Sequence, residues 1–311
     1  MPQPLRPRMS MQRHLTILAW LLLIIYIFLL SSSHHETPST VLFQRRLPTG
    51  LGDRILVLVG AAAAAKSVNP KTTLLYHWFN ERRDRNYSAE LVEQALTLPS
   101  SIKIYSSNAP QTATEVWDDT VWGKGRLPPA EGYDCVPELV PKTYARLQID
   151  ANLFAQRYQE LGLSLMNHVP VNQEYIVVHV RGGDKRERFG HCLDKSMLSS
   201  LPFKIRVVTD DVRLAKSLVA GTITVRSRNL FHDLEIIMGA SGIIMHSPAG
   251  WSSFSAMGAF FRNIPVLTTA QDPWRLDMFK KQGALLHRWF RCDQILDFKQ
   301  SVLRRAQPYT E

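Results

Sequence analysis

The residues with the clearest chemical potential are the six from His179 to Asp184, which read His-Val-Arg-Gly-Gly-Asp. They follow an apolar, β-branched run at 175–180, which predicts a strand. Ligands of open parallel sheets bind beyond the carboxyl ends of the strands, and two glycines let the backbone approach a ligand closely. Arg181 would present there a planar set of donors suited to phosphate oxygens. An arginine in an ordinary surface turn is the alternative.

A second candidate lies at 247–255, which reads Ser-Pro-Ala-Gly-Trp-Ser-Ser-Phe-Ser. It follows a predicted strand at 242–246 and opens a helix near Ser253. Serine hydroxyls and free backbone N–H groups at a helix start form an anion site. Simple N-capping by Ser252 or Ser253 is the alternative. Taken together with Arg181, a shared pyrophosphate accounts better for both segments.

These segments are positioned by an alternation of short apolar runs and helical patterns. The predicted strands are 41–44, 74–78, 102–105, 175–180, 205–209, 223–225, 242–246 and 265–267. The predicted helices are 54–66, 142–167, 211–220, 232–240 and 253–261, with a turn at 50–53 and a long loop at 117–141. Interleaved strands and helices predict an α/β fold whose parallel sheet is covered on both faces. The helix 142–167 falls at the boundary of two halves, near residue 170.

Composition excludes several classes of protein. The chain has 311 residues, 45% of them hydrophobic, which is typical of a folded protein. Its formal net charge is +10, but its basic clusters are short and interrupted by acids, so no nucleic-acid partner is expected. Three cysteines, Cys135, Cys192 and Cys292, permit one disulfide, and the pair is left open. Their spacing does not suit zinc.

The N-terminus predicts a membrane anchor. Residues 15–30 contain no charge and are preceded by Arg6, Arg8 and Arg13. This pattern predicts a cytosolic tail at 1–14, a transmembrane signal-anchor at 15–33 and a stem at 34–40, with everything downstream in the lumen. A cleaved signal peptide is the alternative. An N-glycosylation acceptor at Asn86 agrees with a luminal face.

Four segments occur in the order found in the alpha-1,2-fucosyltransferases and their relatives, which this chain resembles over about 41–270. They are Gly-Leu-Gly-Asp-Arg at 50–54, His-Val-Arg with Asp184, Thr-Asp-Asp at 209–211, and Trp-Ser-Ser-Phe-Ser at 251–255 followed by Gly258-Ala259. The chain departs from that family at Gly182, where the family has a second Arg, and at Ala256-Met257, where it has two Trp. Lys185 is similar to the corresponding residue of the alpha-1,6-fucosyltransferases.

The resemblance implies a GT-B-like fold, with two Rossmann-like halves, 41–170 and 171–311, that face a cleft. It implies that the C-terminal half binds GDP-fucose and that fucose is transferred with inversion, without a metal or other cofactor. Arg181 would hold the pyrophosphate and stabilise the leaving group. The resemblance and the turns together give these substrate-binding candidates: His179, Asp184, Gly50, Gly52, Asp210, Ser252 and Ser253.

An inverting transferase also needs a base for the acceptor hydroxyl. Asp53, Asp184 and Glu187 lie in or just after the motif turns, and Asp53 and Glu187 rank equally. The paired Asp118-Asp119 and Asp210-Asp211 are not the Asp-x-Asp that metal-dependent sugar transferases use.

The sequence therefore predicts a type II membrane fucosyltransferase of the Golgi, or of the endoplasmic reticulum, that acts on a glycan hydroxyl. The alternatives are a metal-dependent transferase that uses another nucleotide-sugar and an inactive GDP-sugar-binding module. No pattern in the sequence predicts the acceptor glycan or the linkage that is formed.

Overall fold

The computed structural model describes most of the chain downstream of residue 38. The described residues are 39–44, 50–78, 88–106, 113, 115–118, 150–170, 173–181, 193, 195–219, 230–247, 252–269 and 289–306. All of them belong to one compact unit, Ser39–Glu311. Within these ranges no helix has the length and apolar character needed to span a bilayer. The predicted anchor at 15–33 lies outside the described residues.

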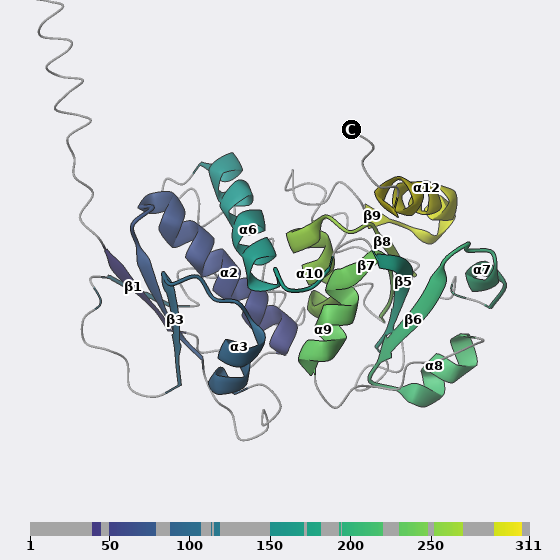
Figure 1. Ribbon diagram of the computed structural model, residues 1–311, viewed down its shortest axis with the longest axis horizontal. Helices are drawn as coiled ribbons and strands as arrows, with labels where there is room; N and C mark the ends of the chain where they lie inside the picture. Colours follow the sequence, from purple (N-terminus) through teal and green to yellow (C-terminus); the bar gives the residue numbers. More distant parts are fainter. Residues whose placement is uncertain are drawn as a thin grey trace, which may run out of the picture. The chain divides into compact units, whose positions relative to one another are not determined.

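The first sheet has four strands in the order β3-β2-β1-β4, all parallel. They are β1 (Thr40–Gln44), β2 (Thr73–His77), β3 (Ile102–Tyr105) and β4 (Glu115–Asp118). Helices α2 (Leu51–Val68) and α3 (Ala89–Ala95) connect the first three strands. In Figure 1 this sheet and its helices are drawn in purple and blue.

The second sheet has five strands in the order β6-β5-β7-β8-β9, again all parallel. They are β5 (Gln173–Val180), β6 (Lys204–Thr209), β7 (Ala240–His246), β8 (Val266–Thr268) and β9 (Trp289–Phe290). The accompanying helices are α7 (Lys195–Ser199), α8 (Val212–Leu218), α9 (Leu230–Gly239), α10 (Ser253–Arg262), the 3-10 turn η2 (Cys292–Gln294) and α12 (Ile295–Ala306). Two parallel α/β sheets confirm the predicted fold class.

Helices α2, α6 (Ala151–Leu165) and α10 pack together between the two sheets (Figure 1). Alanine is the strongest helix former and takes little space, so the run Ala61–Ala65 lets α2 be buried on every side. Gly162 serves the same purpose in α6, because a Cβ there would lie 2.1 Å from the Phe261 ring of α10. The close packing of these helices holds the start of α2 in a fixed relation to the second sheet.

Several element predictions need correction. Helix α2 begins at Leu51, so most of the predicted turn at 50–53 is already helical. Strand β4 occupies the start of the predicted loop 117–141. The segment has only two apolar residues in a row, so its sequence does not indicate a strand, and it becomes one by pairing with β1. Helices α3, α7 and α12 and strand β9 were not predicted. The predicted strand 223–225 and residues 142–149 of the predicted helix lie outside the described residues.

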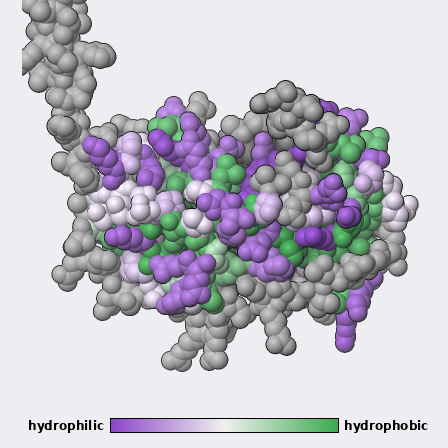
Figure 2. All heavy atoms as spheres, in the orientation of Figure 1, coloured by the Kyte–Doolittle hydropathy of each residue, from purple (hydrophilic) through white to green (hydrophobic). Residues whose placement is uncertain are grey.

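Figure 2 shows hydrophilic and hydrophobic residues interspersed over the visible face. At the end of the second sheet Cys292 forms a disulfide, and its Sγ lies 3.5 Å from the carbonyl oxygen of Thr268. The two other cysteines lie outside the described residues, so the expectation of one disulfide is confirmed while its pairing stays open.

Candidate functional site

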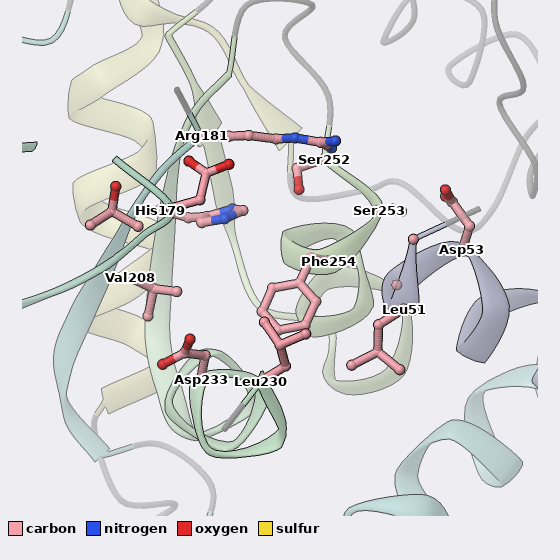
Figure 3. Close-up of a pocket in the computed structure, with 14 residues that line it drawn as sticks. Leu51, Asp53, His179, Arg181, Val208, Leu230, Asp233, Ser252, Ser253 and Phe254 are labelled. Carbon is pink, nitrogen blue, oxygen red and sulfur yellow. The ribbon is translucent and has the colours of Figure 1, made fainter. Parts of the chain in front are cut away.

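A cavity of about 260 Å³ lies where the start of α2 meets the strand ends and helix starts of the second half (Figure 3). Its lining residues are Gly50, Leu51, Gly52, Asp53, His179, Arg181, Val208, Thr209, Asp210, Leu230, Asp233, Ser252, Ser253 and Phe254. Every predicted site residue that the structure describes is therefore in this lining. Residues separated by up to 200 positions in the chain are brought together, and their roles remain predictions.

Arg181 reaches the cavity from the carboxyl end of β5. Its backbone N–H donates to the carbonyl oxygen of His246, 2.9 Å away, which prolongs the pairing of β5 with β7 by one residue. The side chain is half-buried and extends toward Ser252 in Figure 3. His246 itself is buried at the end of β7, with its Nδ1 2.7 Å from Oγ1 of Thr269.

Ser252 occupies the N-cap position of α10, yet its side chain accepts no capping hydrogen bond. Only 1% of the residue is exposed, and its Oγ has no hydrogen-bond partner in the described part of the chain. Its backbone N–H faces Sδ of Met245 at 3.1 Å. The interpretation of Ser252 as an ordinary N-cap is therefore wrong. A buried hydroxyl without a partner next to a helix N-terminus is the kind of group that a ligand satisfies.

The start of α2 lies directly against the start of α10. A Cβ on Gly52 would be 2.6 Å from the backbone nitrogen of Phe254 and 2.9 Å from the backbone carbon of Ser253. Only glycine permits this approach. The N-cap of α2 is Gly50, which has no side chain to bond the first N–H groups, and Asp53 lies in the first turn. The positive ends of two helix dipoles thus meet at one cavity.

His179 is buried at the end of β5, with its Nδ1 hydrogen-bonded to Oγ of Ser255 in α10. Burial and then the neighbouring charge of Arg181 lower the pKa of this imidazole to about 4, while Asp210 acts in the opposite direction. Both causes penalise the charged form. The ring is therefore neutral at physiological pH, and among the described residues of the cavity lining the cation is Arg181.

The two aspartates after β6 have different tasks. Oδ1 of Asp211 accepts from the N–H groups of Arg213 and Leu214, both at 3.1 Å, and so caps α8. Asp210 is exposed and lines the cavity. The structure therefore separates a capping residue from a cavity residue within one Asp-Asp pair, which the sequence alone could not do.

Asp233 was not predicted as a site residue. It lies in the first turn of α9, is 6% exposed and borders the cavity beside Leu230, Phe254 and Val208 (Figure 3). The signal that could have indicated it is an acid one turn into an otherwise apolar helix, next to a strand that carries the site. The structure adds a carboxylate to an otherwise apolar end of the cavity.

Asp184 and Glu187 lie outside the described residues, so their predicted roles stay predictions. Within the described ranges no group of three or more His, Cys, Asp or Glu side chains could hold a metal ion. The donors that converge on the cavity are instead a guanidinium, a serine hydroxyl and backbone N–H groups, which are ligands for an anion.

No protein-family model and no curated protein sequence matches this chain. Among solved structures, it is similar to the E. coli heptosyltransferase WaaC with ADP, at 12% identity and a TM-score of 0.48 over 86% of this chain and 99% of the other. A family 9 glycosyl transferase from Veillonella parvula gives 8% identity and a TM-score of 0.45 over 86% and 97% of the two chains.

The fucosyltransferase NodZ from Bradyrhizobium is similar at 14% identity and a TM-score of 0.33, over 72% of this chain and 94% of NodZ. At such identities and scores, function has to be inferred from the chain's own residues.

Proposed function

We propose that this protein is a GT-B-type glycosyltransferase that takes fucose from GDP-fucose and transfers it to a glycan hydroxyl. The observation that carries the proposal is the meeting, in one cavity, of Arg181 with two helix starts that no side chain caps. A pyrophosphate supplies the negative charge and the acceptor oxygens that this set of donors lacks.

The phosphate site is the best supported part of the proposal. Ser252 presents a buried hydroxyl without a described partner, and Arg181 extends toward it. The first residues of α10 also line this cavity, and the dipole at a helix start favours an anion. Negative charge grows on the pyrophosphate as the sugar leaves, so donors fixed at this position would stabilise the transition state more than the ground state.

The choice of guanine is supported by the far end of the cavity. Val208, Leu230 and Phe254 form an apolar wall, and Asp233 places a carboxylate among them. Guanine has two neighbouring donors, its N1–H and its exocyclic amine, which one carboxylate can accept together. Adenine and uracil lack that pair. A carboxylate that accepts both donors would hold the guanine base in one orientation.

Transfer would proceed by a single displacement. The oxygen of the acceptor hydroxyl forms a bond to the sugar C1 while the bond from C1 to the phosphate oxygen breaks, and its electron pair leaves with GDP. The hydroxyl proton passes to a carboxylate. Asp53 lines the cavity from the first half and is one candidate base, and Glu187 is the other. The two displacement partners lie on opposite faces of C1, so configuration inverts.

The proposed setting is a Golgi membrane, or that of the endoplasmic reticulum, with the residue 15–33 segment as a single-pass anchor and the catalytic body in the lumen. The disulfide at Cys292 supports an oxidising compartment, because cytosolic proteins rarely keep one. The apolar run with arginines on its N-terminal side supports the orientation.

The test uses the purified full-length chain with GDP-fucose and a panel of glycan acceptors, with and without EDTA. Wild-type protein is expected to transfer fucose in both conditions. Arg181→Ala should lower kcat/KM about 100- to 1,000-fold, as the loss of one charge-stabilising donor does. Arg304→Ala is the matched control, because Arg304 is an exposed residue of α12 that bonds Gln300 and is not in the cavity lining.

The same assay separates the alternatives. Transfer that EDTA abolishes would indicate the metal-dependent transferase. GDP binding in a calorimeter, without transfer or hydrolysis on any acceptor, would indicate the inactive binding module. Equal activity of Arg181→Ala and Arg304→Ala would show that transfer does not need Arg181, which contradicts the proposed site.

A further inference from the structure

Ser255 is a buried residue at the start of α10 that belongs to the serine-rich segment but not to the cavity lining. None of its surface is exposed, and its Oγ is hydrogen-bonded to Nδ1 of His179 in β5. A serine in the first turn of a helix usually serves the helix's own N–H groups. This one reaches across to the neighbouring sheet instead, and it contacts a residue that does line the cavity.

The direction of this hydrogen bond follows from what each group has available. The Ser255 hydroxyl has one donor hydrogen and two acceptor lone pairs. A buried donor without a partner is rarer in proteins than an acceptor that is not fully used. Among the described residues, Nδ1 of His179 is the one hydrogen-bond partner of this hydroxyl, so the O–H donates and Nδ1 accepts. The neutral ring then carries its proton on Nε2.

The Nε2–H of that tautomer suits the ligand. His179 exposes 7% of its surface, and it does so in the lining of the cavity, where Figure 3 shows its ring pointing inward. The ring of Phe254 lies 6.0 Å away at an angle of 52°, which limits rotation of the imidazole. An anionic ligand beside Arg181 needs donors. The opposite tautomer would turn a lone pair toward the oxygens of that ligand.

We propose that Ser255 is a positioning residue that holds His179 as the Nε2–H tautomer, so that the ring offers a neutral hydrogen-bond donor to the nucleotide-sugar. The proposal rests on the proposed function for the identity of the ligand. The link between Ser255 and the tautomer does not depend on it, and the two can therefore be tested apart.

The first test needs no ligand. Full-length protein with ¹⁵N-labelled histidine is examined by long-range ¹⁵N–¹H correlation, and His179 is assigned by its loss in His179→Gln. Wild-type protein is expected to show Nε2 protonated and Nδ1 bare. Ser255→Ala should give a mixture of tautomers, and Ser255→Thr, which keeps the hydroxyl, should restore one. Ser217→Ala is the control, because Ser217 is a helical serine of α8 that bonds the Leu214 carbonyl.

The second test measures GDP affinity by calorimetry. Ser255→Ala should weaken binding about 3- to 10-fold, the value of one net hydrogen bond. His179→Gln keeps a donor close to the position of Nε2, and His179→Asn places one close to Nδ1. The glutamine variant should therefore stay within about 3-fold of wild type, whereas the asparagine variant should lose about 10-fold.

Three results would overturn the proposal: a wild-type Nδ1–H tautomer, an unchanged tautomer and GDP affinity in Ser255→Ala, or equal losses in the two His179 variants. Should Ser255→Ala fail to fold, the wild-type spectrum and the His179 pair still decide. A wild-type chain that binds no GDP would contradict the proposed function, while the spectrum would still judge the role of Ser255.

Discussion

Helices α2 and α10 begin at the cavity, and they begin differently from three other helices. The first N–H groups of α3, α6 and α8 are satisfied by the side chains of Ser88, Asp150 and Asp211 respectively. In the part of the chain that the structure describes, no side chain does so for α2 or α10. A capped helix start has little left to offer a ligand, whereas an uncapped one keeps its donors and its dipole. Side-chain caps are thus missing at the two helix starts where a bound ligand would accept from the same N–H groups.

The two uncapped starts also differ from each other. The first turn of α10 carries serines and no acid, and Arg181 lies beside it. The first turn of α2 carries Asp53. A carboxylate near a bound phosphate weakens its binding, but a carboxylate is what an acceptor hydroxyl needs. Under the proposed function, the start of α10 would hold the leaving group, and the start of α2 would carry Asp53 as one of the two candidate bases.

Asp53→Asn tests whether the start of α2 supplies the base, and the largest effect is expected from this substitution. If Asp53 is the base, kcat should fall about 100- to 10,000-fold. GDP affinity should stay equal or increase, because a negative charge beside the phosphates has been removed. Initial rates and calorimetric titration measure both. Asp297→Asn, in the first turn of α12, is the control. An unchanged kcat would leave Glu187 as the candidate.

Gly52→Ala tests whether the two helix starts must touch. The new Cβ would lie 2.6 Å from a backbone nitrogen, so α2 and α10 have to separate. Such overpacking costs about 1–3 kcal/mol and should lower both the Tm and the affinity for GDP. Gly50→Ala is a close control, because a Cβ there meets nothing within 4 Å and the backbone has a φ of −65°. Equal losses of Tm in the two variants would contradict the contact; the Tm is the measurement that decides, because Gly50 also lines the cavity.

The neutral His179 predicts a pH dependence of stability. Its pKa is about 4 in the folded chain, against about 6.5 unfolded. Between these values the unfolded chain binds a proton that the folded chain does not, so the free energy of unfolding falls as the pH falls. The slope from this residue is about 1.4 kcal/mol per pH unit, and it vanishes above pH 6.5.

Urea denaturation at pH 5 and pH 7 measures this slope, which His179→Gln should reduce. The exposed His232 provides the control substitution, His232→Gln, which should leave the wild-type difference in place. A slope that His179→Gln does not alter would mean that folding leaves the pKa of this imidazole unchanged, which contradicts its burial in neutral form.

Ser252→Ala against Ser88→Ala gives the smallest effects and the most direct contrast between an uncapped and a capped start. Ser252→Ala should weaken GDP binding about 3- to 10-fold without loss of stability, because no capping bond is lost. Ser88→Ala should lower the free energy of unfolding by about 1 kcal/mol and leave GDP binding unchanged. Denaturation and calorimetry of both variants show whether one loses only GDP affinity and the other only stability.

Much of this protein could be predicted from local sequence. The β-branched run before Arg181 predicted β5. Similar apolar runs and helical periodicities predicted most of the other strands and helices, because these patterns show which residues of a segment face the core. The glycine, arginine and serine motifs also named residues that the structure places in one cavity.

Only the tertiary structure decided how these parts work together. Strand β4 depends on β1 for its pairing, and the order of strands in each sheet is set by packing. The contact of Gly52 with α10, the missing cap at Ser252, the bond from Ser255 to His179 and the burial of Asp233 all join residues far apart in sequence, or depend on what surrounds them. A residue type fixes which bonds a side chain can make, but its neighbours in space decide which of those bonds are left for a ligand.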